Sequence, residues 1–278
     1  MSKKFLAGLL FLCFAVPGKA QLLSWTADFP KDNDNIEITM DASKGNQGLL
    51  NYSPVSDVYV HVGVITNLST GFSDWKYVKF ACATTTAAAQ AVSLGGNKWK
   101  YTINNIRTFF GVPGGETIQK IAILFRSGSG TVVQKNSDGS DMYIPVYDNT
   151  LATRFSIPFY QPTFNRIPEP ITKNQGDNIS LTAIANQSAD MKLFLNGTQI
   201  QSANGVTTIS ANPVLTTSGN QTIRVDATVG ATTKSESFQF YVAPAVTIAA
   251  LPAGVRDGIN YETGNTSVVL VLYAPGKN

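Results

Sequence analysis

The residues Val58-Tyr59-Val60-His61-Val62-Gly63-Val64 decide how this chain folds. Valine occupies every second position, so one face of the segment is apolar and the other carries Tyr59 and His61. Successive side chains of an extended strand point to opposite faces, so this period of two predicts a strand with one buried side. The alternation recurs at residues 36–40 and 222–225. The chain is therefore expected to be all-β.

The spacing of these segments favours tandem antiparallel β-sandwiches. Helical and strand patterns do not alternate, as a parallel α/β sheet would require. A helical turn is expected only at residues 103–110, and the glycines and proline of residues 111–115 would end it. The strands expected in the first sandwich are residues 36–41, 58–64, 75–80, 98–103, 118–125 and 142–147.

Changes in composition divide the chain into five segments. These are a signal peptide (1–20), a first β-sandwich (21–160), a Pro-rich linker (161–170), an immunoglobulin-like sandwich (171–243) and an incomplete third sandwich (244–278). Four prolines between residues 157 and 170 favour a stiff extended linker.

The second and third units differ in how much of a sandwich the sequence contains. In the second unit, strands are expected at residues 179–185, 191–195, 198–200, 206–209, 221–229 and 235–242. Asn196-Gly197 lies between two of these strands and is typical of a type I′ hairpin. In the third unit only residues 246–249 and 268–273 alternate, and two strands are too few to bury a core. We therefore expect the parent protein to be longer.

The N-terminus predicts export. Lys3 and Lys4 precede the apolar run 5–16, which is followed by Pro17-Gly18 and Lys19-Ala20, as in a secretory signal peptide. The run has 12 residues, whereas a membrane-spanning helix needs about 20. We expect a secreted protein, periplasmic, extracellular or at the cell surface of a bacterium, with no transmembrane segment. Cleavage would lower the formal charge from +3 to 0, which argues against a nucleic-acid partner.

The residues that most catalytic sites require are missing. His61 is the one histidine of the chain, so no additional histidine is present to complete a zinc site. The sequence also contains no G-x-S-x-G motif, which would present a nucleophilic serine. No catalytic residue is assigned. Cys82 is the one cysteine left after signal removal and is expected to be a small strand residue.

Two acidic segments offer oxygen ligands for calcium. They are Asp32-Asn33-Asp34-Asn35 and Asn136-Ser137-Asp138-Gly139-Ser140-Asp141. Asn, Asp and Gly are also the residues that form turns between strands. We favour the turn interpretation, and we expect no cofactor.

Tyr59, His61 and Trp75 form the candidate binding site. Tyr59 and His61 share the outward face of one expected strand, and Trp75 follows a short Gly- and Ser-containing loop. Such rings offer flat apolar surfaces to sugar rings and polar tips to hydroxyl groups. The alternative is that Trp75 packs over a sheet edge and that His61 is a surface imidazole. Trp99 shares its face with Tyr101 and Ile103, which predicts that Trp99 lies in the core.

The first sandwich resembles the starch-binding modules of secreted amylases. The resemblance lies in residues 57–64, 75–78, 97–103, 120–126 and 136–141. In those modules two ring-bearing residues, two apart on a strand, and a following Trp grip α-glucan. The matching positions are Tyr59, His61 and Trp75, so the resemblance implies an α-glucan partner such as starch.

The C-terminal segment carries a second resemblance. Residues 251–261 and 268–277 are similar to the start of the β-sandwich that precedes the barrel in Bacteroidetes-type α-amylase-family glycoside hydrolases. The resemblance implies the non-catalytic N-terminal part of a secreted enzyme, joined covalently to a downstream catalytic domain. The catalytic Asp, Glu and Asp of that barrel have no counterparts here. The alternative function is that of a structural or adhesive cell-surface protein of stacked sandwiches without a sugar site.

Overall fold

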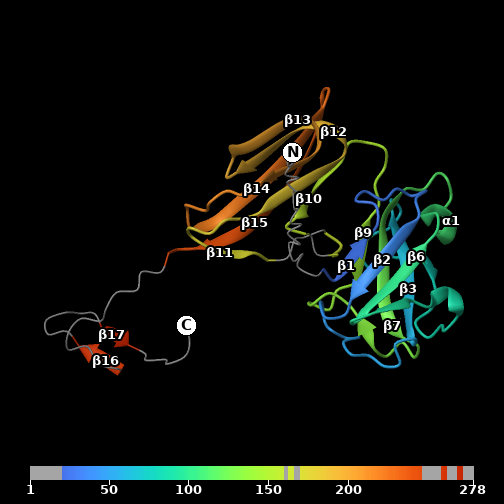
Figure 1. Cartoon of the computed structure of the whole chain (residues 1–278). Coiled ribbons are helices and arrows are strands. Elements are labelled where there is room, and N and C mark those ends of the chain that lie inside the picture. Colours follow the sequence, from blue (N-terminus) through green and yellow to red (C-terminus); the bar gives the residue numbers. More distant parts are fainter. Residues whose placement is uncertain (1–20, 160–161, 166–169, 246–257, 262–267, 272–278) are drawn as a thin grey trace, which may run out of the picture.

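The computed structural model describes residues 21–159, 162–165, 170–245, 258–261 and 268–271. The expected signal peptide (1–20) and the expected strand 246–249 lie outside the described residues. Figure 1 shows two bodies built of strands, with β16 and β17 apart from both. The prediction of an all-β chain with tandem antiparallel sandwiches is confirmed. Among the described residues, no helix has the length and hydropathy needed to cross a membrane.

The first sandwich consists of two antiparallel sheets around one core. One sheet has the order β1 (Leu23–Trp25), β2 (Ile36–Asp41), β6 (Lys98–Ile103), β5 (Val92–Gly95). The other has β4 (Lys76–Lys79), β3 (Val58–Thr66), β7 (Ile118–Ser127) and β8 (Val133–Gln134), with β9 (Met142–Pro145) also paired to β7. The bounds of β2 and β6 match the sequence prediction.

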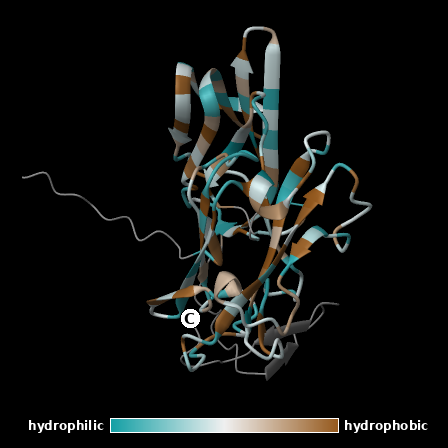
Figure 2. Cartoon of the chain, turned by 90° about the vertical axis from the view of Figure 1, so that its right-hand side faces the viewer, coloured by the Kyte–Doolittle hydropathy of each residue, from teal (hydrophilic) through white to brown (hydrophobic). Residues whose placement is uncertain are grey.

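Alternating side chains from both sheets fill this core. Along β3 the four alternate valines are fully buried, as the period of two predicts. Trp99 on β6 is also buried and donates a hydrogen bond from Nε1 to the Val55 carbonyl at 2.9 Å. Figure 2 shows the resulting alternation of hydrophobic and hydrophilic positions along the strands. The prediction that Trp99 is a core residue is confirmed.

Short helical turns connect strands at one end of the first sandwich. They are the 3₁₀ turn η1 (Ala87–Ala89) and the helix α1 (Ile106–Phe110). The Asn105 side chain caps α1 by accepting a hydrogen bond from Thr108 N at 3.0 Å. Gly111 ends the helix with a φ of 77°, a conformation that glycine adopts without a Cβ clash.

The strands of the second sandwich are connected in one six-stranded sheet. They are β10 (Thr153–Ile157), β11 (Thr172–Asn174), β12 (Leu181–Leu195), β13 (Thr198–Ala211), β14 (Gly219–Val229) and β15 (Thr232–Ala243). The first part of β12 pairs with β10 and the last part with β14. Asn196 and Gly197 connect β12 to β13 with φ angles of 51° and 82°, in agreement with the predicted type I′ turn.

Strand β10 places the transition between the sandwiches earlier than composition suggests. Composition predicts that the first sandwich extends to residue 160, but β10 pairs with β12 of the second. The reason is the burial of Phe155, whose ring packs edge-on against Phe238 at a centroid distance of 5.0 Å. The prolines that follow β10 therefore do not mark the boundary between the two sandwiches.

The segment expected to be a free extended linker contacts the first sandwich. Pro162 is buried, and its carbonyl accepts hydrogen bonds from Tyr143 N at 2.7 Å and from Asn136 Nδ2 at 3.3 Å. In the third unit, β16 (Gly258–Tyr261) pairs antiparallel with β17 (Val268–Val271). β17 lies within the predicted strand 268–273, whereas β16 was not predicted.

Arg154 on β10 connects the two sandwiches. Its side chain is 7% exposed and donates from Nη2 to Asp28 Oδ1 at 2.7 Å and from Nε to the Asp28 carbonyl at 3.0 Å. The guanidinium also lies 5.5 Å from the centroid of the Phe29 ring. Trp25 and Phe159 add a ring contact at 5.6 Å. The junction therefore has both polar and aromatic contacts.

We expect Arg154→Ala to lower the free energy of unfolding by about 1–2 kcal/mol, because a charge-assisted hydrogen bond is lost at a buried site. Urea denaturation measures this change. Arg224→Ala is the matched control, since Arg224 also pairs with an aspartate and stacks on Phe194, but its side chain is 44% exposed. That control should cost less than about 0.5 kcal/mol. Equal costs for the two substitutions would contradict the assignment of Arg154 to a buried junction.

Candidate functional site

Strand β3 presents Tyr59 and His61 on the outer face of its sheet. β3 pairs with β7 at both positions, whereas its pairing with β4 is confined to Val62 and Val64. Gly63 is the next outward position on β3. A Cβ at Gly63 would lie 3.4 Å from Trp75 Cβ and 3.1 Å from the Lys76 carbonyl oxygen. The missing side chain at Gly63 therefore leaves room for Trp75 to lie close over β3.

His61 and Trp75 form a stacked pair on this face. Their ring centroids are 5.4 Å apart and the ring planes differ by 25°. His61 Nδ1 lies 2.8 Å from the Phe80 carbonyl oxygen. A carbonyl only accepts hydrogen bonds, so Nδ1 carries the proton, and in the neutral ring Nε2 is an acceptor. Both side chains are half-buried.

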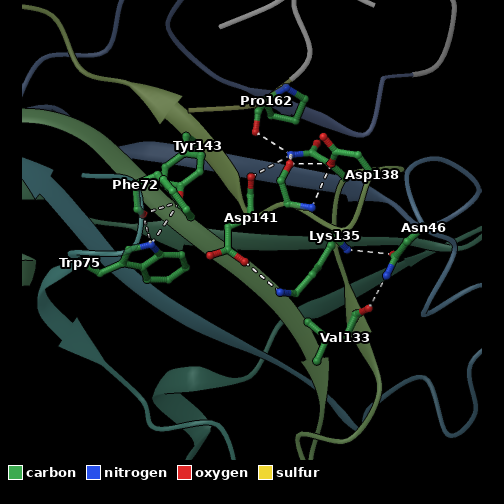
Figure 3. Close-up of polar contacts among 11 residues, drawn as sticks. Asn46, Phe72, Trp75, Val133, Lys135, Asp138, Asp141, Tyr143 and Pro162 are labelled. Carbon is green, nitrogen blue, oxygen red and sulfur yellow. Dashed lines mark hydrogen bonds and ion pairs between the residues drawn. The ribbon is translucent and has the colours of Figure 1, made fainter. Parts of the chain in front are cut away.

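The indole of Trp75 is held by two acceptors (Figure 3). Nε1 donates to the Phe72 carbonyl at 3.1 Å and to Tyr143 Oη at 3.3 Å. Tyr143 Oη itself donates to the Phe72 carbonyl at 2.7 Å. Burial raises the pKa of Tyr143 above its ordinary value, so the hydroxyl keeps the proton that it donates. The orientation of Trp75 is thus fixed before any ligand binds.

Tyr59 lies to one side of this pair. Its ring is half-buried, and the Arg126 guanidinium lies 5.7 Å from the ring centroid. Arg126 is buried and donates from Nη2 to the carbonyls of Ala81 and Thr84 at 3.0 and 2.7 Å. The structure therefore brings His61 and Trp75 into contact and places Tyr59 beside Arg126, two residues before His61 on β3.

Three aromatic residues of this face were not predicted. Phe72 precedes Trp75 in the loop between β3 and β4 and is 64% exposed. Tyr143 comes from β9, and Phe164 comes from the segment between β10 and β11. Phe72 could have been found from its position three residues before Trp75. Tyr143 and Phe164 are distant in sequence, and no local pattern indicates their position.

The two acidic segments form turns whose carboxylates have hydrogen-bond partners. Asp32 Oδ2 accepts from Arg107 Nε and Nη2 at 2.9 and 2.6 Å. Asp138 Oδ1 accepts from Ser140 N at 2.9 Å, and Asp141 pairs with Lys135 at 3.0 Å. Within the described residues, no group of three or more His, Cys, Asp or Glu side chains is arranged to hold a metal ion. These contacts support the turn interpretation.

The expectation that Cys82 is a strand residue is wrong. β4 ends at Lys79, and Phe80 has a φ of 60°, which turns the chain out of the extended conformation. Cys82 consequently lies in the following turn and is exposed. The predicted strand 75–80 is shorter than expected for the same reason.

Glu116 links the strands that carry the site. Its carboxylate accepts hydrogen bonds from Thr66 Oγ1 at the end of β3 and from Tyr77 Oη on β4. Both bonds lower the pKa of Glu116 below its ordinary value, and the bond from Thr66 has the larger effect. Glu116 thereby joins β3 to the strand that immediately follows Trp75.

The pKa of Glu116 is lower in the folded state than its unfolded-state value of 4.5. Its contribution to stability is therefore fully present above pH 4.5 and is lost as the pH falls through the folded-state pKa. We expect Glu116→Gln to be less stable than the native chain near neutral pH and to lose less stability on acidification below about pH 4.5. Urea denaturation at a series of pH values measures both effects. Glu37→Gln, at a carboxylate that is 47% exposed, is the control. An unchanged pH profile in Glu116→Gln would contradict this role.

Comparison with known proteins gives no family assignment. No family model matches the chain. No curated protein matches it either. Several solved structures show a similar arrangement of strands, and we describe three of them.

The D0-D1 domain of intimin matches with 11% identity over 79% of this chain and 97% of its own, at a TM-score of 0.35. Fibronectin(III)-like modules of Clostridium thermocellum CbhA match with 15% identity over 34% of this chain and 100% of their own, at a TM-score of 0.26. A lytic polysaccharide monooxygenase of Jonesia denitrificans matches with 14% identity over 30% of this chain and 63% of its own, at a TM-score of 0.22. All three TM-scores are below 0.5, so the β-sandwich fold of this chain is established by its own strand pairing. Many functions share this fold.

Proposed function

We propose that the outer face of the β4-β3-β7 sheet binds α-glucan, and that the chain is the non-catalytic binding part of a secreted α-amylase-like glycoside hydrolase. The observation that carries this proposal is the stacked and partly exposed pair of His61 and Trp75. Tyr59 extends the same face along β3.

The chemistry of the pair suits a sugar. The faces of glucose rings present C–H groups that pack on aromatic rings, and their hydroxyls form hydrogen bonds with polar groups at the ring edges. His61 Nε2 offers an acceptor at such an edge. Trp75 is already held by its bonds to Phe72 and Tyr143, so little side-chain entropy is lost on binding.

The enzyme part of the proposal rests on the two resemblances. The positions that match the starch-binding modules are Tyr59, His61 and Trp75, and the structure brings two of them into ring contact. A binding module tethered to a catalytic domain raises the local concentration of substrate without contributing to the chemistry. Secretion fits this function, because polymeric starch is too large to enter a cell intact.

We expect Trp75→Ala to reduce retention on insoluble starch at least about tenfold, because the main stacking surface is removed. The native chain should be retained on starch and not on cellulose or xylan. Tyr241→Ala is the control, since Tyr241 is an exposed aromatic residue of the second sandwich. A pull-down with each insoluble polysaccharide gives the bound fractions.

Two results would contradict the proposal. Undiminished retention of Trp75→Ala would place the binding site elsewhere. A native chain that is not retained on starch would remove α-glucan as the partner and favour the alternative of a structural or adhesive surface protein.

A further inference from the structure

The segment between β10 and β11 of the second sandwich adds an aromatic ring to the candidate site. Residues 162–165 lie against β9, where Tyr143 N donates to the Pro162 carbonyl at 2.7 Å. Asn136 Nδ2 donates to the same carbonyl at 3.3 Å, and Figure 3 shows Pro162 near the turn that contains Asp138. Two residues after this anchor, Phe164 reaches the outer face that carries Trp75.

Phe164 contacts the aromatic residues that hold Trp75. Its ring is edge-on to Tyr143 at a centroid distance of 5.4 Å and to Phe72 at 6.4 Å. The Lys120 ammonium lies 4.9 Å from its centroid, a cation–π distance. Ile65 and Ala122 form the apolar floor beneath this group. Phe164 is therefore seated against the sheet by several contacts, and its side chain is half-buried.

The aromatic rings form one connected cluster. Trp75 is 5.4 Å from His61 and 6.2 Å from Tyr143, and Tyr143 is 5.4 Å from Phe164. Tyr143 is 2% exposed, so it supports its neighbours and offers no surface of its own. Phe72, which is 64% exposed, contacts the half-buried Phe164, and the two form a second aromatic surface beside the pair of His61 and Trp75. Two aromatic surfaces on one face fit an oligosaccharide better than a monosaccharide.

We propose that Phe164, supplied by the segment between β10 and β11 of the second sandwich, forms the far end of the α-glucan site together with Phe72. This inference rests on the proposed function. A short ligand contacts the pair of His61 and Trp75, whereas a longer chain also reaches Phe164. The segment between β10 and β11 thus makes the site selective for longer α-glucans.

The test is isothermal titration of the native chain and of Phe164→Ala with maltotriose and maltoheptaose. We expect Phe164→Ala to weaken maltoheptaose binding about fivefold and to leave maltotriose binding unchanged. Trp75→Ala should weaken the binding of both sugars. Phe159→Ala is the matched control, because Phe159 is in the same connecting region but contacts Trp25.

Two more variants separate stacking from packing. Phe164→Leu keeps an apolar side chain against Tyr143 but lacks a planar ring, so it should behave like Phe164→Ala. Phe164→Tyr keeps the ring and should bind maltoheptaose as the native chain does. Native maltoheptaose affinity in Phe164→Leu would overturn the role of the ring as a sugar platform.

Three other outcomes of the titration distinguish failure of the inference from failure of the proposed function. If the native chain binds maltoheptaose and Phe164→Ala binds it equally well, the inference is overturned and the proposed function stands. If Phe164→Ala binds either sugar more tightly, the segment covers the site rather than extending it, which also overturns the inference. If the native chain binds neither sugar, the proposed function fails, and the inference fails with it.

Discussion

The burial of alternate valines on β3 is the constraint on which the rest of the structure depends. These side chains fill the core between the two sheets of the first sandwich, and β3 pairs with β7 along its length. A shift of register by one residue would exchange the two faces of the strand. Core packing therefore forces Tyr59 and His61 onto the outer face of the sheet. The candidate site is a consequence of how the core is filled.

The outer face becomes a defined site because distant segments fix its rings. Gly63 leaves space over β3, the loop before β4 fills that space with Trp75, and Tyr143 on β9 holds the indole. The segment after β10 then adds Phe164 to the same cluster. The second sandwich is joined to the first through Arg154 and Asp28. A segment of the second sandwich thus belongs structurally to the candidate site, and the two units are linked by more than their covalent chain.

The sequence contains the local features of this fold but not its long-range pairings. Alternation predicts β3 and β6 and the burial of Trp99, and Asn196-Gly197 predicts the β12–β13 hairpin, because these features depend on residues near one another. The pairing of β10 with β12 depends instead on the burial of Phe155 against a residue far along the chain. The same holds for the site. The outward position of His61 follows from the period of two, whereas the support of Trp75 by Tyr143 follows only from the three-dimensional structure.

The indole N–H resonances of the three tryptophans provide the most direct test of the central claim, that the outer face of the β4-β3-β7 sheet binds α-glucan. Trp75 lies on this face, Trp99 is buried in the core, and Trp25 contacts Phe159 at the junction of the sandwiches. The measurement is a titration of the ¹⁵N-labelled chain with maltoheptaose, followed by two-dimensional NMR. Binding of α-glucan at this face should shift the Trp75 indole signal with the ligand while the Trp99 and Trp25 signals stay in place. A titration that leaves the Trp75 signal unchanged at saturating ligand would contradict it.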